Sequence, residues 1–364
     1  MAWTMTPEHI SNLARGAAVF GTGGGGDPYI GALLARQALN RHGDVAMVSV
    51  DEVPQDATIV MVAMMGAPTV MVEKLPSFDE VIGPVRAIEP FLDGPVTHIA
   101  CAEVGGVNST IPIVAAAALG LPLIDGDAMG RAFPELQMVL PTLSGVSATP
   151  LAFADDKGNT GVLNTVDNQW AERIARVACV EMGCSIMLSL FPQPGAQLRD
   201  TMVRDSLTAC LRVGEAIAAA RDANEDPVAR AVHLLAGRDL FAGKVVDVER
   251  ATTTGFARGS ARIQGELGVL ELSFQNEHLM AVLDGAVLVT TPDLIMVLEH
   301  DSGEPITTEG LRYGQRVRVI SAPSDERWHS PAALALVGPA YFGYDVPSRR
   351  YDGAVEHTKT GVPV

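Results

Sequence analysis

Hydrophobic and polar positions follow two different patterns along this chain. In the first half, short apolar runs alternate with segments whose apolar residues have helical spacing. Such alternation predicts an α/β layer with a largely parallel sheet, because parallel strands need helical crossovers. The predicted strands are 45–50, 58–65, 96–101 and 121–124, and the predicted helices are 6–19, 29–41, 79–91 and 110–120.

The second half begins with three helical segments and then becomes rich in β-branched alternation with Gly and Asp-Gly turns. This pattern predicts a mostly antiparallel sheet or barrel. We therefore expect an N-terminal α/β domain over 1–165 and a C-terminal domain over 166–364, helical and then β-rich, with the intervening helices free to pack on either half. The predicted helices are 168–183, 199–222 and 226–236, and the predicted strands are 244–249, 261–266, 269–275, 279–283, 286–290 and 316–320.

A glycine-rich stretch, Phe20 to Pro28, separates the first two predicted helices. Thr6 and Asp27 are the predicted N-caps of these helices, and each is followed by a proline. The glycines predict a tight loop whose backbone N–H groups converge on one spot, a ready-made site for an anion or oxyanion. We therefore expect substrate-binding groups at Gly23, Gly24, Gly25, Gly26 and Asp27.

Two other interpretations of this stretch remain open. Gly21-x-Gly23-x-x-Gly26 formally matches a dinucleotide-binding fingerprint, and Asp51 follows a predicted strand. That fingerprint requires a strand directly before its first glycine, whereas the segment here has helical spacing, and no Gly-Lys-Ser/Thr follows to form a phosphate loop. The sequence thus disfavours a nucleotide cofactor, and a purely structural turn between helices is the other alternative.

The densest polar cluster, Asp125 to Glu135, follows the short predicted strand 121–124. Asp125 and Asp127 could supply a general base or hold a cation, and Arg131 could bind a substrate carboxylate through two hydrogen bonds. Alternatively, the segment is a capped turn in which Asp125 or Asp127 caps a helix and Arg131 pairs with Glu135 four residues on.

Glu103 follows the strand 96–101 and precedes a Gly-Gly turn and Asn108. Ligands bind at the carboxyl ends of strands in open α/β sheets, so Glu103 is a candidate catalytic residue and Asn108 a candidate binding residue. An ordinary surface turn is the alternative. Gln275 to His278 could reach the site across the domain interface or simply form a hairpin turn, and Pro292 to Ile295 is similar.

Composition narrows the functional classes. The net charge of −17 argues against nucleic acid and anionic membrane surfaces as partners. Four cysteines lack CxxC spacing and histidine partners, which predicts reduced, buried thiols rather than disulfides or zinc. The N-terminal segment lacks the pattern of a secretory leader, and no apolar run has membrane-spanning length, so we expect a cytoplasmic protein.

Taken together, the motifs resemble the S-methyl thiohydantoin desulfurase family, also known as DUF917. The resemblance covers nearly the whole chain. It rests on the stretches 20–29, 102–108, 125–135, 241–245, 255–259, 274–277, 292–295 and 338–345.

This resemblance implies hydrolysis of an S-methylated thiohydantoin ring to a hydantoin with release of methanethiol, or action on a related cyclic amide. For that chemistry we expect Glu103, Asp125 and Asp127 to provide the base and any ligands of a divalent metal. Arg131, Glu135 or the glycine loop would hold the substrate. A dinucleotide-dependent oxidoreductase and a non-catalytic subunit of a hydantoinase- or oxoprolinase-type complex are the alternatives, and alanine-rich helices suit a homo-oligomer.

Overall fold

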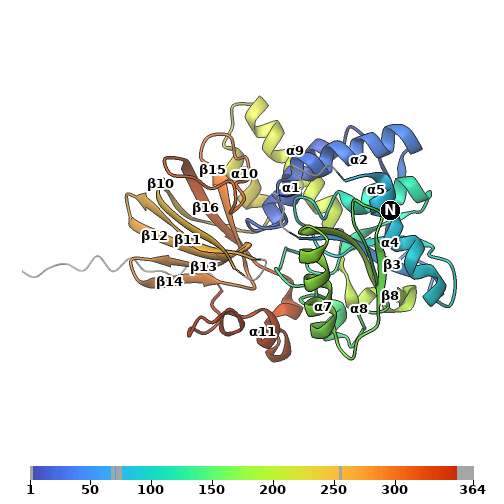
Figure 1. Ribbon diagram of the computed structural model, residues 1–364. Coiled ribbons are helices and arrows are strands. Elements are labelled where there is room, and N and C mark those ends of the chain that lie inside the picture. The colour runs from blue at the N-terminus through green and yellow to red at the C-terminus, as the bar shows by residue number, and fades with distance from the viewer. Residues whose placement is uncertain (1–2, 67–69, 71–75, 254–255, 351–364) are drawn as a thin grey trace, which may run out of the picture.

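A computed structural model describes residues 3–66, 70, 76–253 and 256–350 (Figure 1). The N-terminal part of the chain folds into a mixed sheet with helices on both faces, and the C-terminal part forms an antiparallel sheet beside it. This arrangement confirms the predicted fold class. Residues 351–364 of the predicted C-terminal domain lie outside the described residues.

The first sheet has the strand order β1-β2-β5-β4-β3-β8-β6-β7, and β9 pairs with β5. Its centre, β2-β5-β4-β3, is parallel, and the pairs outside this centre are antiparallel. Strand β8 was not predicted from the sequence; it lies between β3 and β6 and brings residues beyond 165 into this sheet. The strands are β1 (Trp3–Met5), β2 (Val45–Ser49), β3 (Thr58–Gly66), β4 (His98–Cys101), β5 (Leu123–Asp127), β6 (Leu151–Ala154), β7 (Thr160–Leu163), β8 (Ser185–Pro194) and β9 (Val203–Arg204).

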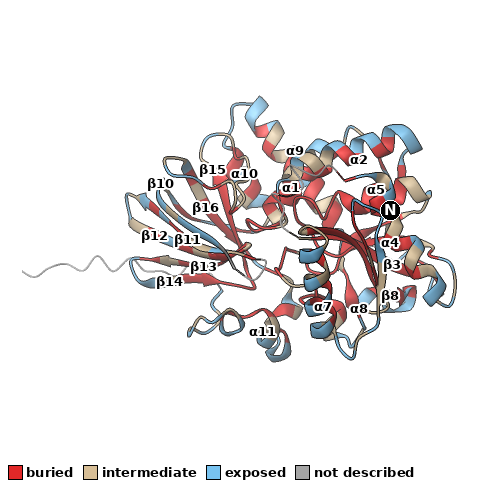
Figure 2. Cartoon of the chain, viewed as in Figure 1, coloured by how far each residue is buried: buried red, intermediate tan, exposed pale blue. Residues whose placement is uncertain are grey.

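Helices cover both faces of this sheet, and Figure 2 shows the buried residues concentrated between the layers. Helices α1, α2, α4, α5 and α9 contribute to the core on one face, and α7, α8 and α11 to the core on the other. The helices are α1 (Ile10–Phe20), α2 (Pro28–His42), α4 (Phe78–Ile88), α5 (Ile111–Leu119), α6 (Leu140–Leu143), α7 (Asn168–Glu181), α8 (Leu198–Thr201), α9 (Ser206–Asp222), α10 (Pro227–Leu234) and α11 (Pro331–Val337), with short 3₁₀ turns η1 (Glu89–Phe91), η2 (Gly195–Gln197), η3 (Glu326–His329) and η4 (Pro339–Phe342).

Two helix predictions need correction. The first helix begins at Ile10 rather than Thr6, because the Thr6 backbone N–H donates to the His9 ring in a preceding turn and Thr6 does not cap the helix. The segment 199–222 is not one helix. It is interrupted at β9, which pairs with the end of β5, so a tertiary strand pairing overrides local helical spacing.

The second sheet has the order β14-β13-β12-β11-β10-β16-β15 and is antiparallel throughout, forming a half-barrel. Helices α9 and α10 pack on β15 and β16 and join the two halves of the molecule. The strands are β10 (Arg238–Thr253), β11 (Phe256–Gly265), β12 (Gly268–Gln275), β13 (Glu277–Leu283), β14 (Ala286–Thr290), β15 (Leu294–Glu299) and β16 (Arg316–Ala322).

Candidate functional site

A cavity of about 90 Å³ lies where the carboxyl ends of β3 and β4 meet the turn between β12 and β13. Its walls are mainly apolar, and a few polar side chains converge on it, which is the usual character of a small-molecule site. It is smaller than the roughly 300 Å³ at the lower end of drug-sized pockets. The lining residues used below are Gly25, Glu103, Asn108, Glu135, Arg176 and Glu277.

Glu103 lies just beyond the end of β4 and lines this cavity, as the sequence analysis proposed. Asn108 Nδ2 donates to Glu103 Oε1 at 2.6 Å and to the Met64 carbonyl at 3.2 Å, while Asn108 Oδ1 accepts from the Met64 N–H at 2.7 Å. Burial raises the pKa of Glu103 to about 7, partly offset by the Asn108 hydrogen bond. This carboxyl is therefore orientationally fixed and can exchange a proton near neutral pH.

Glu277, the first residue of β13 after the tight turn from β12, is the second buried carboxyl of the cavity. Burial raises its pKa well above the ordinary value, and the charge of Glu103 raises it further. Its Oε2 has no hydrogen-bond partner within the described part of the chain. Gln275 to His278 thus forms a hairpin turn and also reaches the cavity, so both alternatives of the sequence analysis hold.

Asp127 ends β5 and is fully buried behind the cavity wall. Its Oδ2 accepts hydrogen bonds from the backbone N–H groups of Val104 at 3.0 Å, Met129 at 3.0 Å and Gly130 at 2.7 Å. Burial raises its pKa to about 6 despite these hydrogen bonds. Asp127 therefore ties the loop after β5 to the residue that follows Glu103.

Asp125 lies in the same strand, but its carboxylate serves a different contact. Oδ1 accepts the Thr208 N–H at 3.0 Å in the first turn of α9, and Oδ2 accepts from the Thr208 hydroxyl and from Trp3 Nε1 at 3.2 Å. It is not among the residues that line the cavity. The structure thus places Glu103 and Asp127 close together. The Asp125 carboxylate instead forms hydrogen bonds that connect β5 to β1 and α9.

The glycine loop lies against both halves of the molecule. Thr22, Gly23, Gly25 and Gly26 have positive φ values, which explains the need for glycine at most of these positions. A Cβ on Gly25 would lie 2.7 Å from the Gly105 Cα, and one on Gly24 would overlap the Glu277 carboxyl. The glycines therefore allow the loop to lie close to both Gly105 and Glu277. Gly25 also lines the cavity, as Glu103 does.

The dinucleotide interpretation lacks its required context. Gly21 is the C-cap of helix α1, so a helix and not a strand precedes the glycines. Asp51 is exposed and forms ion pairs with Arg199 at 3.0 Å and Arg204 at 3.4 Å. Asp27 is also exposed and caps α2 by accepting the Tyr29 N–H at 2.8 Å, as predicted.

Arg131 is completely buried, and all its donors are occupied. Nε donates to the Ala132 carbonyl at 3.0 Å, Nη1 to the carbonyls of Pro292 and Asp293, and Nη2 to the Thr22 hydroxyl at 2.9 Å and the His278 carbonyl. Arginine has five N–H donors, so none is left for a substrate carboxylate in this arrangement. Nor does Arg131 pair with Glu135, whose Oε2 accepts from Gln137 and Tyr341.

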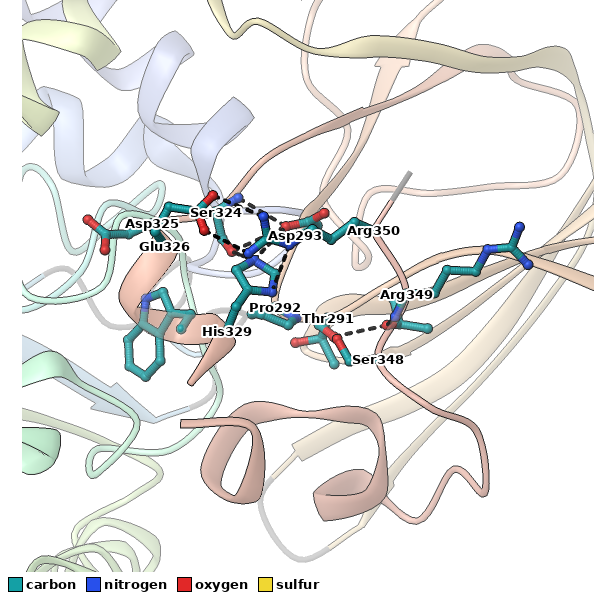
Figure 3. A network of polar contacts seen from close by, with 12 residues as sticks. Thr291, Pro292, Asp293, Ser324, Asp325, Glu326, His329, Ser348, Arg349 and Arg350 are labelled. Carbon is teal, nitrogen blue, oxygen red and sulfur yellow. Dashed lines mark hydrogen bonds and ion pairs between the residues drawn. The ribbon is translucent and has the colours of Figure 1, made fainter. Parts of the chain in front are cut away.

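Asp293, whose carbonyl accepts a hydrogen bond from Arg131, also belongs to a second polar network, which Figure 3 shows. His329 Nε2 lies 3.0 Å from Ser324 Oγ and 3.2 Å from Asp293 Oδ1. Arg350 Nε donates to His329 Nδ1 at 3.1 Å, so the ring proton of the neutral histidine is on Nε2. In that tautomer Nε2 carries a proton, so the ring cannot accept the Ser324 proton. The Ser324, His329 and Asp293 side chains therefore form a structural hydrogen-bond network and not a catalytic triad.

Comparison with protein-family models places these motifs in a known group. Residues 8–165 match the model described as S-Me-THD-like, N-terminal domain, and residues 166–351 match S-Me-THD-like, C-terminal domain. The chain belongs to the S-Me-THD-like family. The resemblance to the S-methyl thiohydantoin desulfurase family is thereby confirmed, and the family is named for a desulfurase-like enzyme.

One solved structure extends the comparison of this S-Me-THD-like protein. It is a protein from Chromobacterium violaceum, 24% identical, with a TM-score of 0.81, covering 96% of this chain and 100% of its own. At this identity the likeness shows a shared fold. The comparison with curated proteins gave no match.

Within the described residues, the S-Me-THD-like chain holds no group of three or more His, Cys, Asp or Glu side chains placed to bind a metal ion. All four cysteines are free; Cys101, Cys179 and Cys210 are buried as predicted, whereas Cys184 is partly exposed. No described helix has both the length and the apolar character needed to cross a bilayer.

Among the polar residues of the cavity, the sequence did not point to Arg176 at all, and it pointed to Asn276 and Glu277 only within the stretch Gln275 to His278. Arg176 belongs to α7, pairs with Glu172 at 2.7 Å, and stacks over Phe256 of the second sheet at 4.6 Å. No local motif marks Arg176 or Glu277, because only the packing of the two halves brings them to the cavity. The signal for Glu277 was its place in a turn between two predicted strands.

Proposed function

We propose that this chain is a hydrolase acting on a small cyclic thiohydantoin- or hydantoin-like ring, with S-methyl thiohydantoin as the reference substrate. The observation that carries the proposal is the pair of buried carboxyls, Glu103 and Glu277, on one mainly apolar cavity. Two acids with unequal environments supply a base and an acid at the same pH. Family membership supports the same substrate class.

The two carboxyls suit the two halves of the reaction. Glu103, with a pKa of about 7, would take a proton from water as its oxygen attacks the ring carbon that bears sulfur. Glu277, whose pKa is raised well above its usual range, would be protonated and donate to the ring nitrogen. A tetrahedral carbon with hydroxyl and thiomethyl groups results.

Collapse of this intermediate restores both acids. The hydroxyl proton passes to the Glu277 carboxylate as the carbonyl forms, and the leaving thiolate takes the proton held by Glu103. The balance is one water consumed, one hydantoin formed and one methanethiol released. Asn108 would keep Glu103 in position throughout, because its amide is itself anchored on both backbone groups of Met64.

The test is thiol release and ring opening by the purified chain offered S-methyl thiohydantoins and plain hydantoins, with and without chelator. We expect thiol release from the wild type. In Glu103→Gln and Glu277→Gln we expect kcat to fall by about 10²- to 10⁴-fold, since each loses a proton-transfer group but keeps its shape. Glu271→Gln, at an exposed position in β12 away from both the cavity and α7, is the matched control and should retain activity.

Full turnover by both folded cavity variants would contradict the assignment. The alternatives have separate readouts. Nicotinamide or flavin absorbance in the purified protein would favour an oxidoreductase. A chain inactive alone but active with a second subunit would favour a role within a larger complex.

A further inference from the structure

Helix α7 carries an apolar face that no described part of the chain covers. Its opposite side packs on the core through Ala171, Ala175 and Cys179. The outward side is apolar for almost the whole length of the helix, which is uncommon on a monomer surface and typical of an interaction site. The side chains are Trp170, Ile174, Val177 and Val180, which are 47%, 40%, 66% and 51% exposed, with Val166 before the helix at 88%.

We propose that this face binds a second copy of the chain, with the two α7 helices antiparallel across a twofold axis at Val177. The charges on the face fit such a pairing. Arg173 and Glu181 are exposed and equally spaced on either side of Val177. In an antiparallel pair centred on Val177, Arg173 of one copy lies level with Glu181 of the other, twice over.

The same axis pairs the apolar residues. Ile174 and Val180 are also equally spaced about Val177, so each lies level with the other in the second copy, and Val177 meets itself. Trp170 extends the apolar contact at both ends, with the Arg173 guanidinium 5.4 Å from its ring. The pattern is thus self-complementary, as an isologous interface requires.

Anionic lipid and nucleic acid fit this face less well than a second copy, because neither offers a positive charge to Glu181. A net charge of −17 opposes docking on anionic lipid or nucleic acid. Helix α7 spans about 21 Å at 1.5 Å per residue, so the interface is small and dissociates on dilution. Arg176, next to Val177, lines the cavity from the adjacent face of the helix. A dimer at this face would therefore stabilise the position of one cavity wall.

The experiment measures mass by light scattering at about 100 µM and on dilution, a concentration that populates micromolar dimers. We expect a dimer for the wild type and a monomer for Val177→Asp. Leu267→Asp, in the turn between β11 and β12 where the side chain is 56% exposed, is the control and should stay dimeric. A circular dichroism spectrum shows that each variant is folded.

A charge exchange tests the register itself. Arg173→Glu and Glu181→Arg should each raise the dimer dissociation constant at least about tenfold, and the double variant should restore it, because like charges then become opposite again. Val177→Cys in a Cys184→Ser background should form a disulfide-linked dimer under oxidation, and Leu267→Cys should not.

A monomeric wild type at the highest concentration, or a dimer that survives Val177→Asp, overturns the proposal. A monomeric wild type would mean that the apolar face of α7 binds a different protein. Because these measurements follow mass and cross-linking, their outcome is independent of the proposed enzymatic activity.

Discussion

Asn108 Nδ2 donates to Glu103 Oε1 at 2.6 Å, and this hydrogen bond fixes the carboxyl on the cavity. It also stabilises the charged form of Glu103 and so opposes the effect of burial on its pKa. The amide thus sets both the position and the protonation of the proposed base.

Asn108→Ala should therefore shift the pH dependence of thiol release. The wild-type rate should rise with pH through about 7, because the proposed base must be deprotonated. Without the amide, the pKa of Glu103 rises, so the rising limb moves to higher pH and the rate at neutral pH falls about tenfold or more. Rate against pH, measured at saturating substrate, checks this.

The matched control is Thr201→Val, which removes another buried hydrogen bond, from Thr201 Oγ1 to Gln193 Oε1. Both variants should lose roughly 1–3 kcal/mol of stability, since each leaves buried polar groups unpaired. Only Asn108→Ala should move the pH profile. An equal shift in the control would mean that Asn108 acts through stability alone.

Burial of Glu103 also predicts how stability depends on pH. Its pKa is about 7 in the folded chain against an ordinary 4.5, so between these values the folded state holds a proton that the unfolded state has lost. Stability from this group is complete below about pH 4.5 and is lost as pH rises through 7. Glu103→Gln should remove this loss, worth roughly 3 kcal/mol between the two limits.

Urea unfolding of the wild type and Glu103→Gln at pH 5 and pH 8 measures this difference. Stability should fall less in the variant than in the wild type over this interval. Glu271→Gln, whose side chain is exposed, should follow the wild type. Parallel pH dependence of wild type and Glu103→Gln would show that Glu103 titrates normally.

The positions of two carboxylates near the cavity could be predicted from the sequence, for a simple reason. Asp127 ends β5 and Glu103 lies just beyond the end of the neighbouring parallel strand β4, and such strand ends must meet at one edge of a sheet. Asp125 shares the strand with Asp127, but its role depends on Thr208 and Trp3, which no local pattern connects to it. The sequence therefore predicted that Glu103 and Asp127 lie at one edge of the sheet, but not which of the carboxylates line the cavity.

The remainder of the site depends on contacts between distant segments. Glu277 reaches the cavity only because the β12–β13 turn lies against the glycine loop, where Gly24 leaves room for its side chain. Likewise, β9 interrupts a segment with helical spacing because β5 offers a free edge at Gly126 and Asp127. Periodicity reports local preference, and neither contact is local.

Arg131 predicts a large effect on stability. It is a buried cation whose hydrogen bonds join Thr22 to the carbonyl groups of Pro292 and Asp293 in the other half of the molecule. Arg131→Met should cost several kcal/mol, because it leaves these acceptors buried and unpaired. Arg131→Lys, with three donors, should lose less. Chemical unfolding ranks the two, and a Met variant as stable as the wild type would contradict this role.

Gly24→Ala tests whether the glycine loop positions Glu277. A Cβ at Gly24 would overlap the Glu277 carboxyl, while its backbone φ is one that alanine can adopt. Glu277 must therefore move, and we expect kcat to fall about 10²-fold, the effect of a misplaced catalytic group. Gly94→Ala is the control, because its Cβ would meet only Thr58 Oγ1 at 3.9 Å. If both variants kept full activity, Glu277 would not need its present position for turnover, and its role as the proposed acid would be lost.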